Sequence, residues 1–378
     1  MIADLALSSG LTVADGCFVA RRDPAKLIID DTGLDLLPGF IDLHGDAFER
    51  AIAPRPGVHL PVEIALAEVE AQLLAAGITT AYLAITLSWE AGLRSVATYK
   101  IVRDALLTRG RAQTPDIRLH VRFEAANLGA LEMLLEDIAA GHVHMLSFND
   151  HTPGIVKKLL NPVAVSKFVD RTGQSYEDFC LSARQAGDVT PLQIAAAQER
   201  LADAARQAGI PMASHDDSSL EERAYFRRLG ACISEFPTTL EVALAASAAG
   251  EPTVMGAPNV VRGGSHIGWH GAEALIKQKA CSILCSDYHY PSLLQAVYKL
   301  TRNGSTTMQQ AVALVTENAA MAAGLSCRGR LDAGQRADFL MVKPGVVPQL
   351  MAVVANGQLA YLAPGMAARL STASPQPA

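Results

Sequence analysis

The 378-residue sequence has no uninterrupted run of about 18 apolar residues, the length that a membrane-spanning helix requires. Its opening segment, MIADLALSSG, contains no basic stretch and no long apolar core, so it lacks the features of a signal peptide. These absences predict a cytoplasmic protein with no membrane partner.

Cysteine is scarce, and no two cysteines form a CxxC pair. In a chain of this length, scattered cysteines are typical of reduced core residues and not of a disulfide framework. We therefore expect free cysteines packed in the core: Cys17, Cys180, Cys232, Cys281, Cys285 and Cys327.

Charged residues make up only 19% of the chain, whereas 50% of its residues are hydrophobic. This composition allows a large core, and the length suits one large domain with a smaller one. The formal net charge of −6 argues against nonspecific binding to nucleic acid. We expect no nucleic-acid partner, and a homodimer is compatible with the sequence.

The most informative segment is LPGFIDLHGDAFER, residues 37–50. A largely apolar run at 40–43 leads into His44 and Asp46, where a buried strand should end. Alternate residues of a strand share a face, so both side chains can point at one spot. Imidazole and carboxylate are metal ligands, and parallel barrels place their chemistry at the C-terminal ends of their strands. The segment predicts a metal-dependent hydrolase.

Both ends of the chain contain short strand-like runs separated by glycine and proline, and these runs predict one small β-sandwich built from both termini. The runs are 11–13, 17–20, 27–29, 339–342, 351–354 and 358–361. The predicted boundaries are 1–37 and 329–370 for the β-sandwich, 38–328 for the central domain, and 371–378 for a disordered tail.

In the central domain, strand-like runs alternate with amphipathic helices such as 61–76, 191–207 and 239–249. This alternation indicates parallel strands, and about eight such units predict a (β/α)8 TIM-like barrel of the α/β class. The candidate strands are 40–45, 79–85, 117–123, 143–148, 210–214, 231–235, 253–256 and 282–286. The longest interruption, 152–190, is either a lid over the active site or an inert surface insertion.

Polar residues follow most of these strands at the same end. One histidine after a strand is usually structural, but a repetition on successive strands is typical of a barrel with its active site at that rim. The residues are His44, Asp46, Arg122, Glu124, Asn149, Asp150, His151, His215, Asp216, Asp217, Glu235 and Asp287.

Four of these side chains supply the nitrogen and oxygen donors that suit Zn²⁺, Mn²⁺ or a similar divalent ion, and we predict them as metal ligands. They are His44, Asp46, Glu124 and His215. Glu124 is the expected bridging carboxylate if two ions bind, and a salt bridge to Arg122 is the alternative.

Asp287, on the last strand, is predicted both as a ligand and as the base that accepts a proton from the attacking water. Asp216 and Asp217 either orient His215 or cap the helix that follows.

A second group of residues lies at 256–266, where glycines allow close approach of the backbone to a ligand. Within it, Arg262 and His266 could hold phosphate oxygens. Upstream, the prolines at 54 and 56 place Arg55 on a stiff loop after the first ligands. Arg55 is either a phosphate clamp or a surface charge.

At this point the motifs match a known family. LPGFIDLH near the start and GRLDAGQRADF at 329–339 resemble the amidohydrolase superfamily, in which a barrel carries a β unit built from both termini. Further motifs resemble its subgroup of ribose 5-triphosphate diphosphatases from the carbon–phosphorus lyase pathway. They are HGD at 44–46, PRPGV at 54–58, GITT at 77–80, RFE at 122–124, NDHTPG at 149–154, ASHDD at 213–217, SEFPTT at 234–239, MGAPNVVRGGSH at 255–266 and SDYHYPSLLQA at 286–296.

The ligand pattern departs from that of the superfamily. Asp46 replaces the second histidine of the commoner HxH motif. No lysine ends the fourth strand, which leaves Glu124 as the substitute bridge. Glu235 stands where histidine is common and is a tentative ligand. The residues assigned to substrate binding are Arg55, Asp150, His151, Asp217, Arg262 and His266.

The resemblance implies metal-dependent hydrolysis of alpha-D-ribose 1-methylphosphonate 5-triphosphate to the 5-phosphate and pyrophosphate, in phosphonate catabolism. It implies one or two divalent ions, with Zn²⁺ first and Mn²⁺ or Fe²⁺ as options. One alternative is hydrolysis of a C–N bond, as by a deaminase or deacetylase, at the same metal site. Another is a catalytically silent barrel within a multiprotein complex.

Overall fold

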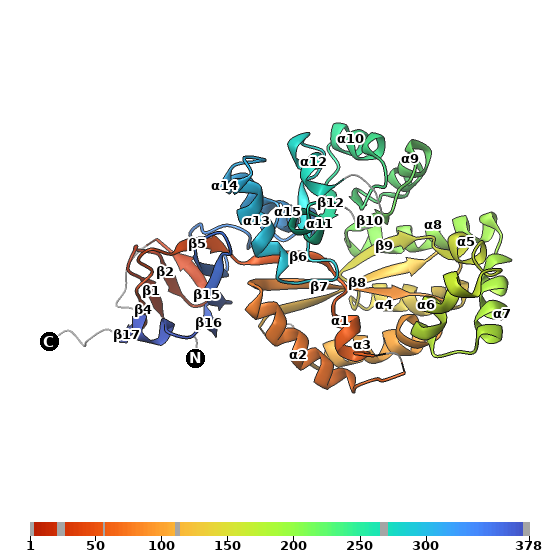
Figure 1. Ribbon diagram of the computed structural model, residues 1–378, viewed down its shortest axis with the longest axis horizontal. Coiled ribbons are helices and arrows are strands. Elements are labelled where there is room, and N and C mark those ends of the chain that lie inside the picture. Colours follow the sequence, from red (N-terminus) through yellow and green to blue (C-terminus); the bar gives the residue numbers. More distant parts are fainter. Residues whose placement is uncertain (1–3, 21–26, 56, 110–113, 265–270, 373–378) are drawn as a thin grey trace.

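The eight predicted central strands form one parallel sheet in the computed structural model, which describes residues 4–20, 27–55, 57–109, 114–264 and 271–372 (Figure 1). The strands neighbour one another in chain order. They are β6 (Phe40–Gly45), β7 (Ile78–Leu87), β8 (Asp116–Glu124), β9 (Met145–Asn149), β10 (Met212–His215), β11 (Ile233–Glu235), β12 (Thr253–Gly256) and β13 (Ile283–Cys285). The order confirms the predicted barrel.

The first and last strands meet through the chain just beyond them. Gly45 and Asp287 form an isolated parallel bridge. The amide of Asp287 donates to the carbonyl of His44 at 2.9 Å, and the amide of Asp46 donates to the carbonyl of Asp287 at 3.1 Å. Barrel closure therefore brings the two ends of the central domain together at the residues predicted to carry the chemistry.

Helices cover the outside of the barrel. The longest, α8, shows why these segments are helical. Thr190 and Gln193 form a capping box, Pro191 occupies the first turn, and Gly209 ends the helix in a left-handed conformation. With α8 included, the helices of the barrel are α1 (Phe48–Ile52), α2 (Val62–Ala75), α3 (Val96–Arg109), α4 (Leu131–Ala139), α8 (Pro191–Ala208), α9 (Leu220–Leu229), α10 (Leu240–Ala248), α11 (Ala257–Arg262), α12 (Ala272–Lys277), α13 (Ser292–Arg302), α14 (Met308–Ala313) and α15 (Glu317–Ala322).

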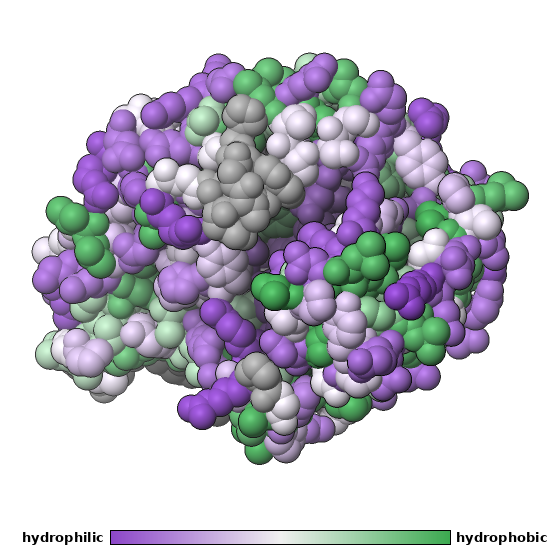
Figure 2. All heavy atoms as spheres, turned by 45° about the vertical axis from the view of Figure 1, so that its right-hand side comes forward, coloured by the Kyte–Doolittle hydropathy of each residue, from purple (hydrophilic) through white to green (hydrophobic). Residues whose placement is uncertain are grey.

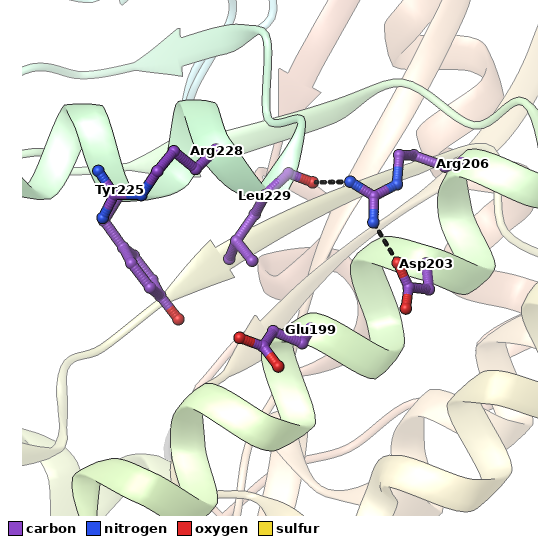
Figure 3. Close-up of a pocket in the computed structure, with 6 residues that line it drawn as sticks. All are labelled: Glu199, Asp203, Arg206, Tyr225, Arg228 and Leu229. Atoms are coloured by element: carbon purple, nitrogen blue, oxygen red, sulfur yellow. Dashed lines mark hydrogen bonds and ion pairs between the residues drawn. The ribbon is translucent and has the colours of Figure 1, made fainter.

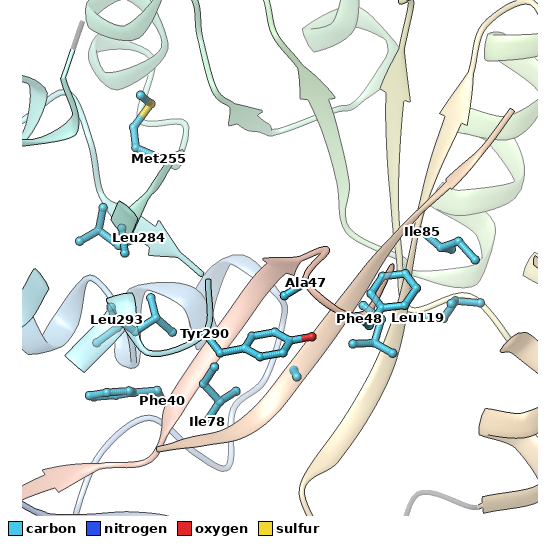
Figure 4. Packing of buried hydrophobic residues seen from close by; sticks show 14 of the residues in the cluster. Phe40, Ala47, Phe48, Ile78, Ile85, Leu119, Met255, Leu284, Tyr290 and Leu293 are labelled. Atoms are coloured by element: carbon cyan, nitrogen blue, oxygen red, sulfur yellow. The ribbon is translucent and has the colours of Figure 1, made fainter. Parts of the chain in front are cut away.

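The main core lies between the sheet and these helices. Phe40, Phe48 and Leu119 are among the buried side chains that pack there (Figure 4). A smaller cluster, including Ile41 and Ile283, fills the barrel interior. The interior therefore holds apolar side chains below the polar residues of the strand ends, as expected for a packed barrel.

Strand β6 departs from simple alternation. Its pairing with β7 shifts register between Asp42 and Gly45, directly around His44. A register shift of this kind re-aims side chains at the end of a strand. The direction of His44 therefore depends on this irregularity and not only on the alternation that the sequence predicts.

The two termini form two further sheets, which Figure 1 shows beside the barrel. One sheet contains β1 (Leu5–Leu7), β2 (Thr12–Ala14), β3 (Cys17–Val19), β4 (Leu27–Ile29) and β17 (Leu370–Thr372). The other contains β5 (Asp35–Pro38), β14 (Phe339–Lys343), β15 (Gln349–Ala355) and β16 (Gln358–Leu362). One apolar cluster draws on both sheets, from Leu5 to Met366. This confirms a small β unit built from both ends of the chain.

Strands β1, β5 and β17 are absent from the predicted set. Ser371 and Thr372 of the predicted tail pair within β17. The remainder of that tail, 373–378, lies outside the described residues.

The segment 152–190 contains three helices, α5 (Thr152–Val156), α6 (Pro162–Thr172) and α7 (Tyr176–Gly187). They share a small core of their own that includes Ile155, Val165 and Phe179. The indole nitrogen of Trp89 donates to the hydroxyl of Thr152 at 2.9 Å. The segment is thus a packed helical layer joined to the barrel.

All six cysteines are free. Cys180, Cys281 and Cys285 are buried, as predicted, whereas Cys232 and Cys327 are exposed, so the predicted core position is wrong for these two. Within the described ranges, none of the helices has the length and apolar character needed to cross a membrane.

Candidate metal centre and active site

Strand β8 contributes three polar side chains to the barrel interior at alternate positions: His120, Arg122 and Glu124. All three are buried. His120 lies deepest, where Nδ1 is 2.9 Å from the carbonyl oxygen of Leu43 and Nε2 is 3.0 Å from the hydroxyl of Ser147. His120 is missing from the predicted site residues because it lies inside a strand and not at its end.

Glu235 lies at the centre of a group of histidines. One of its carboxylate oxygens is 3.1 Å from Nδ1 of His44, and the other is 3.4 Å from Nδ1 of His215. Nε2 of His120 is 3.9 Å from the same carboxylate. The rings of His44 and His215 stack with centroids 5.3 Å apart. Residues far apart in the chain therefore converge on one buried carboxylate.

The histidines of this group are neutral. Burial lowers the pKa of His44 to about 3 and that of His120 to about 4, and it lowers the pKa of His215 well below its usual value. Arg122 adds to the effect at His44 and His215. A neutral imidazole keeps a lone pair for a metal ion, so burial holds these side chains in the form that ligates metals.

The hydrogen bonds of His215 identify its tautomer. Nη2 of Arg122 lies 2.8 Å from Nε2 of His215, and a guanidinium can only donate. Nε2 therefore accepts, and Nδ1 carries the proton that faces Glu235. In metal sites, a ligating histidine commonly donates its second N–H to a carboxylate in this way. His215 is thus oriented with its lone pair away from Glu235.

The donor set fits a divalent cation. Ligand atoms of His44, His120 and Glu235 lie within 4.8 Å of one another, and so do those of His151, His215 and Asp216. Imidazole and carboxylate donors of this kind suit Zn²⁺ or Mn²⁺. His44 and His215 were both predicted as ligands, and the structure brings them into two adjacent groups.

Asp287 lies beside these groups at the seam of the barrel. Burial, together with the charge of Asp46, raises the pKa of Asp287 to about 7, and the charge of Arg122 opposes the increase. Its backbone has a positive φ of 54°. A carboxyl group with a pKa near neutrality can accept a proton and release it again, which suits a general base. Asp46 belongs to neither donor group, although its charge also acts on His44.

Glu124 belongs to neither donor group and instead binds His151 and Thr152. Its oxygens accept from the amide of His151 at 2.8 Å, from Nδ1 of His151 at 3.0 Å, and from the hydroxyl of Thr152 at 2.9 Å. Burial alone would raise the pKa of Glu124, but these hydrogen bonds lower it overall. The alternative salt bridge to Arg122 does not form. Its role as a bridging ligand stays a prediction.

His151 lies at the rim, with Nε2 3.7 Å from Asp216. Burial lowers the pKa of His151, but the hydrogen bonds to Asp216 and Glu124 outweigh that effect and raise it to about 9. Without a metal ion, His151 is therefore positively charged at neutral pH, and it must release its proton before it can ligate one. It lies between the buried donors and the helical segment that begins at Thr152.

The helical segment also lines a shallow cavity of about 280 Å³ beside the rim. Asp150, Thr152 and Lys157 contribute polar groups to it. Figure 2 brings this side of the molecule forward, and the face is hollowed near its centre between hydrophilic side chains. Of the residues assigned to substrate binding, Asp150 and His151 lie on this side.

Asp217 belongs to a buried network of hydrogen bonds and ion pairs. It is fully buried and accepts from Ser214 at 2.5 Å, from Ser234 at 3.1 Å and from Arg223 at 3.1 Å. Arg223 also pairs with Glu251 at 3.1 Å. Capping by Asp216 or Asp217 is wrong as an alternative, because Ser219 caps the helix that follows.

We expect Asp217→Ala to reduce the free energy of unfolding by about 3 kcal/mol, because it leaves the buried guanidinium of Arg223 short of one partner. Denaturant unfolding measures this loss. Asp216→Asn, on the partly exposed neighbour, is the control and should cost less than about 1 kcal/mol. A loss below that limit for Asp217→Ala would contradict the structural role.

The remaining predicted residues are Arg55, Arg262 and His266. Arg55 lies exposed in the loop after α1, and Arg262 is exposed at the end of α11. His266 lies outside the described residues. The role of Arg55 as a phosphate clamp stays a prediction.

A larger groove of about 520 Å³ lies between α8 and α9 on the outer side of the barrel (Figure 3). Its Arg206 bonds to the carbonyl of Leu229 and pairs with Asp203. Because these charges are satisfied and the groove lies away from the strand ends, we do not assign the chemistry to it.

Comparison with known proteins agrees with this geometry. The model of the amidohydrolase family matches residues 36–368. The chain is 33% identical over 352 residues to alpha-D-ribose 1-methylphosphonate 5-triphosphate diphosphatase of Escherichia coli (strain K12), which covers 89% of this chain and 91% of that protein.

Solved structures share the fold at low identity. A 5-methylcytosine deaminase from Klebsiella pneumoniae is 13% identical with a TM-score of 0.60, over 96% of this chain and 97% of that one. A triazine hydrolase variant is 13% identical with a TM-score of 0.63, over 95% of both chains.

Proposed function

The chain belongs to the amidohydrolase family, and on this premise we propose that it is a metal-dependent hydrolase that releases pyrophosphate from a ribose 5-triphosphate. The observation that carries the proposal is the 33% identity to the diphosphatase, which extends over 89% of the chain. The expected substrate is the compound in that relative's name, alpha-D-ribose 1-methylphosphonate 5-triphosphate.

Neutral histidines and carboxylates are the side chains that would hold the metal. His44 and His215 are predicted ligands in adjacent donor groups, and His120 and Glu235 complete one of those groups. Asp46, Glu124 and Asp287 remain proposed ligands. When bound, a divalent ion polarises a phosphoryl oxygen and lowers the pKa of the attacking water.

In the proposed reaction, water attacks the α phosphorus. The new bond joins the water oxygen to that phosphorus, and the bond from the α phosphorus to the bridging oxygen of the β phosphate breaks. Pyrophosphate leaves with the bonding electron pair, and the proton lost by the water passes to the carboxylate of Asp287. The raised pKa of Asp287, about 7, supports its use as that base.

The polyanionic substrate requires cationic partners. His151, whose pKa is raised to about 9 by Asp216 and Glu124 despite its burial, offers one positive charge at the rim. Arg262, Arg55 and His266 are the further proposed contacts to phosphate oxygens. Such groups stabilise the negative charge that develops on the phosphoryl oxygens.

A substrate panel tests the proposal. The metal-loaded protein is incubated with ribose 5-triphosphates, with and without the C1 methylphosphonate, and with amides and aminopyrimidines as C–N substrates. We expect pyrophosphate release from the triphosphates and none from protein treated with a chelator. Release of ammonia or carboxylate without pyrophosphate would instead favour the C–N reaction, and inactivity on every compound at full metal occupancy would favour a noncatalytic barrel.

We expect Arg262→Ala to raise KM for the triphosphate about tenfold, the effect of losing ~1.4 kcal/mol of binding, with kcat nearly unchanged. Steady-state kinetics measure both constants. Arg228→Ala in the outer groove is the matched control, because it removes the same charge far from the strand ends. An unchanged KM would place Arg262 outside the binding site.

A further inference from the structure

Three arginines are buried among the described residues: Arg122, Arg223 and Arg328. Arg223 pairs with two carboxylates, as described above. The Nη1 atom of Arg328 lies 2.7 Å from Asp116. Both cations are therefore neutralised by the chain itself, as is usual for buried charges.

Arg122 is different. Its side chain is 5% exposed, and it forms no ion pair with any residue in the described ranges. Within the described residues, its hydrogen bond runs to a neutral acceptor, Nε2 of His215. Its Nε atom is buried and has no partner in the described part of the chain.

None of the neighbouring carboxylates in the described part of the chain forms an ion pair with Arg122, although its charge acts on Asp287 and Glu235. Glu124 lies two residues along the same strand, but its oxygens are taken by His151 and Thr152. Both oxygens of Glu235 face histidines. An unpaired cation in such a site costs several kcal/mol, so a fold retains it only where other interactions compensate.

We propose that Arg122 binds an anionic oxygen of the substrate, on the phosphoryl group that is attacked. This inference rests on the proposed function and names a further residue for it. The guanidinium lies between His120 and Glu124 on β8 and contacts His215, so it faces the same donor groups as the reacting atoms would. A planar guanidinium can give two parallel N–H donors to one phosphoryl group.

The hydrogen bond to His215 is compatible with this role. One lone pair on Nε2 can accept from Arg122 or ligate a metal ion, but it cannot do both. Metal binding at His215 would therefore release Nη2 of Arg122 from its only acceptor among the described residues. The arginine would then have its donors available when an anion enters.

Anion binding to the metal-loaded protein tests the inference without requiring turnover. Calorimetric titration with pyrophosphate and with inorganic phosphate compares the unmodified protein with Arg122→Gln and Arg122→Lys. We expect Arg122→Gln to weaken pyrophosphate binding about 30-fold, which corresponds to ~2 kcal/mol. Arg122→Lys should fall between the two, since lysine keeps the charge but loses the planar pair of donors.

Metal content and thermal unfolding are measured on the same samples. Arg228→Gln is the control and should bind pyrophosphate like the unmodified protein. Arg122→Gln with unchanged affinity and full metal content would overturn the inference. If that variant does not fold, Arg122→Lys decides: a severalfold weaker affinity supports the inference, and an unchanged affinity overturns it.

The proposed hydrolysis and the proposed role of Arg122 can be rejected independently of each other. Pyrophosphate affinity that depends on Arg122, in a protein that hydrolyses none of the triphosphates, would reject the proposed reaction and keep the anion site. Pyrophosphate release with affinity and kcat/KM independent of Arg122 would keep the reaction and reject the role of this arginine.

Discussion

Asp287→Asn is expected to lower kcat for pyrophosphate release about 1,000-fold, because it removes the carboxylate that accepts the proton from the attacking water. The substitution is nearly isosteric. Metal content and the free energy of unfolding should therefore stay close to those of the unmodified protein, because asparagine keeps one oxygen donor and the two donor groups do not contain Asp287. Rapid-mix or steady-state kinetics, metal analysis and denaturant unfolding of the same sample measure these three quantities.

Asparagine is the appropriate replacement for a structural reason. Asp287 has φ of 54°, and asparagine and aspartate adopt this left-handed region more readily than most other residues. The backbone of Asp287 also hydrogen-bonds to the backbone of His44 and Asp46, where the barrel closes. A replacement that strains this backbone would therefore disturb the closure of the barrel. Asp332→Asn, on the exposed surface, is the control. Unchanged turnover in Asp287→Asn would exclude this residue as the base.

His215→Ala is expected to weaken metal binding at least about 100-fold, so that the purified variant loses most of one ion and nearly all activity. His215 belongs to the donor group with His151 and Asp216, and its buried position keeps its imidazole neutral. Elemental analysis after dialysis against a weak chelator measures the loss. Added metal should also stabilise the variant less against heat than it stabilises the unmodified protein.

His142→Ala is the matched control, because His142 pairs with Asp137 outside the donor groups. It should retain the metal and the activity. Full metal retention in His215→Ala would remove His215 from the set of ligands, and the group formed by His44, His120 and Glu235 would then be the remaining candidate.

Strand positions were readily predicted from the sequence. Buried parallel strands are short apolar runs with polar residues at their ends, so the segment from Phe40 to His44 and its seven counterparts could be recognised locally. Short strands of the terminal sheets such as β1 and β17 could not, because they take their conformation from their partners in the sheet.

The site was predicted in part. His44 and His215 lie at the ends of apolar strands. A polar residue at such a position is not needed for core packing, so it can be recognised in the sequence as a candidate site residue. His120 gives no such signal, since a histidine inside an apolar strand is most often a satisfied core residue. Only the packing of β8 against Leu43 and Ser147 places it beside Glu235.

The sequence by itself determined the fold class, the closing of the barrel and the rim where polar residues gather, because these follow from periodicity and from the chemistry of strand ends. The tertiary structure decided how those polar residues pair. Glu124 binds His151 and Thr152, Asp217 neutralises Arg223, and Arg122 has no carboxylate partner among the residues that the structure describes. Pairing depends on distances of a few ångströms between residues remote in the chain, and no local pattern encodes those distances.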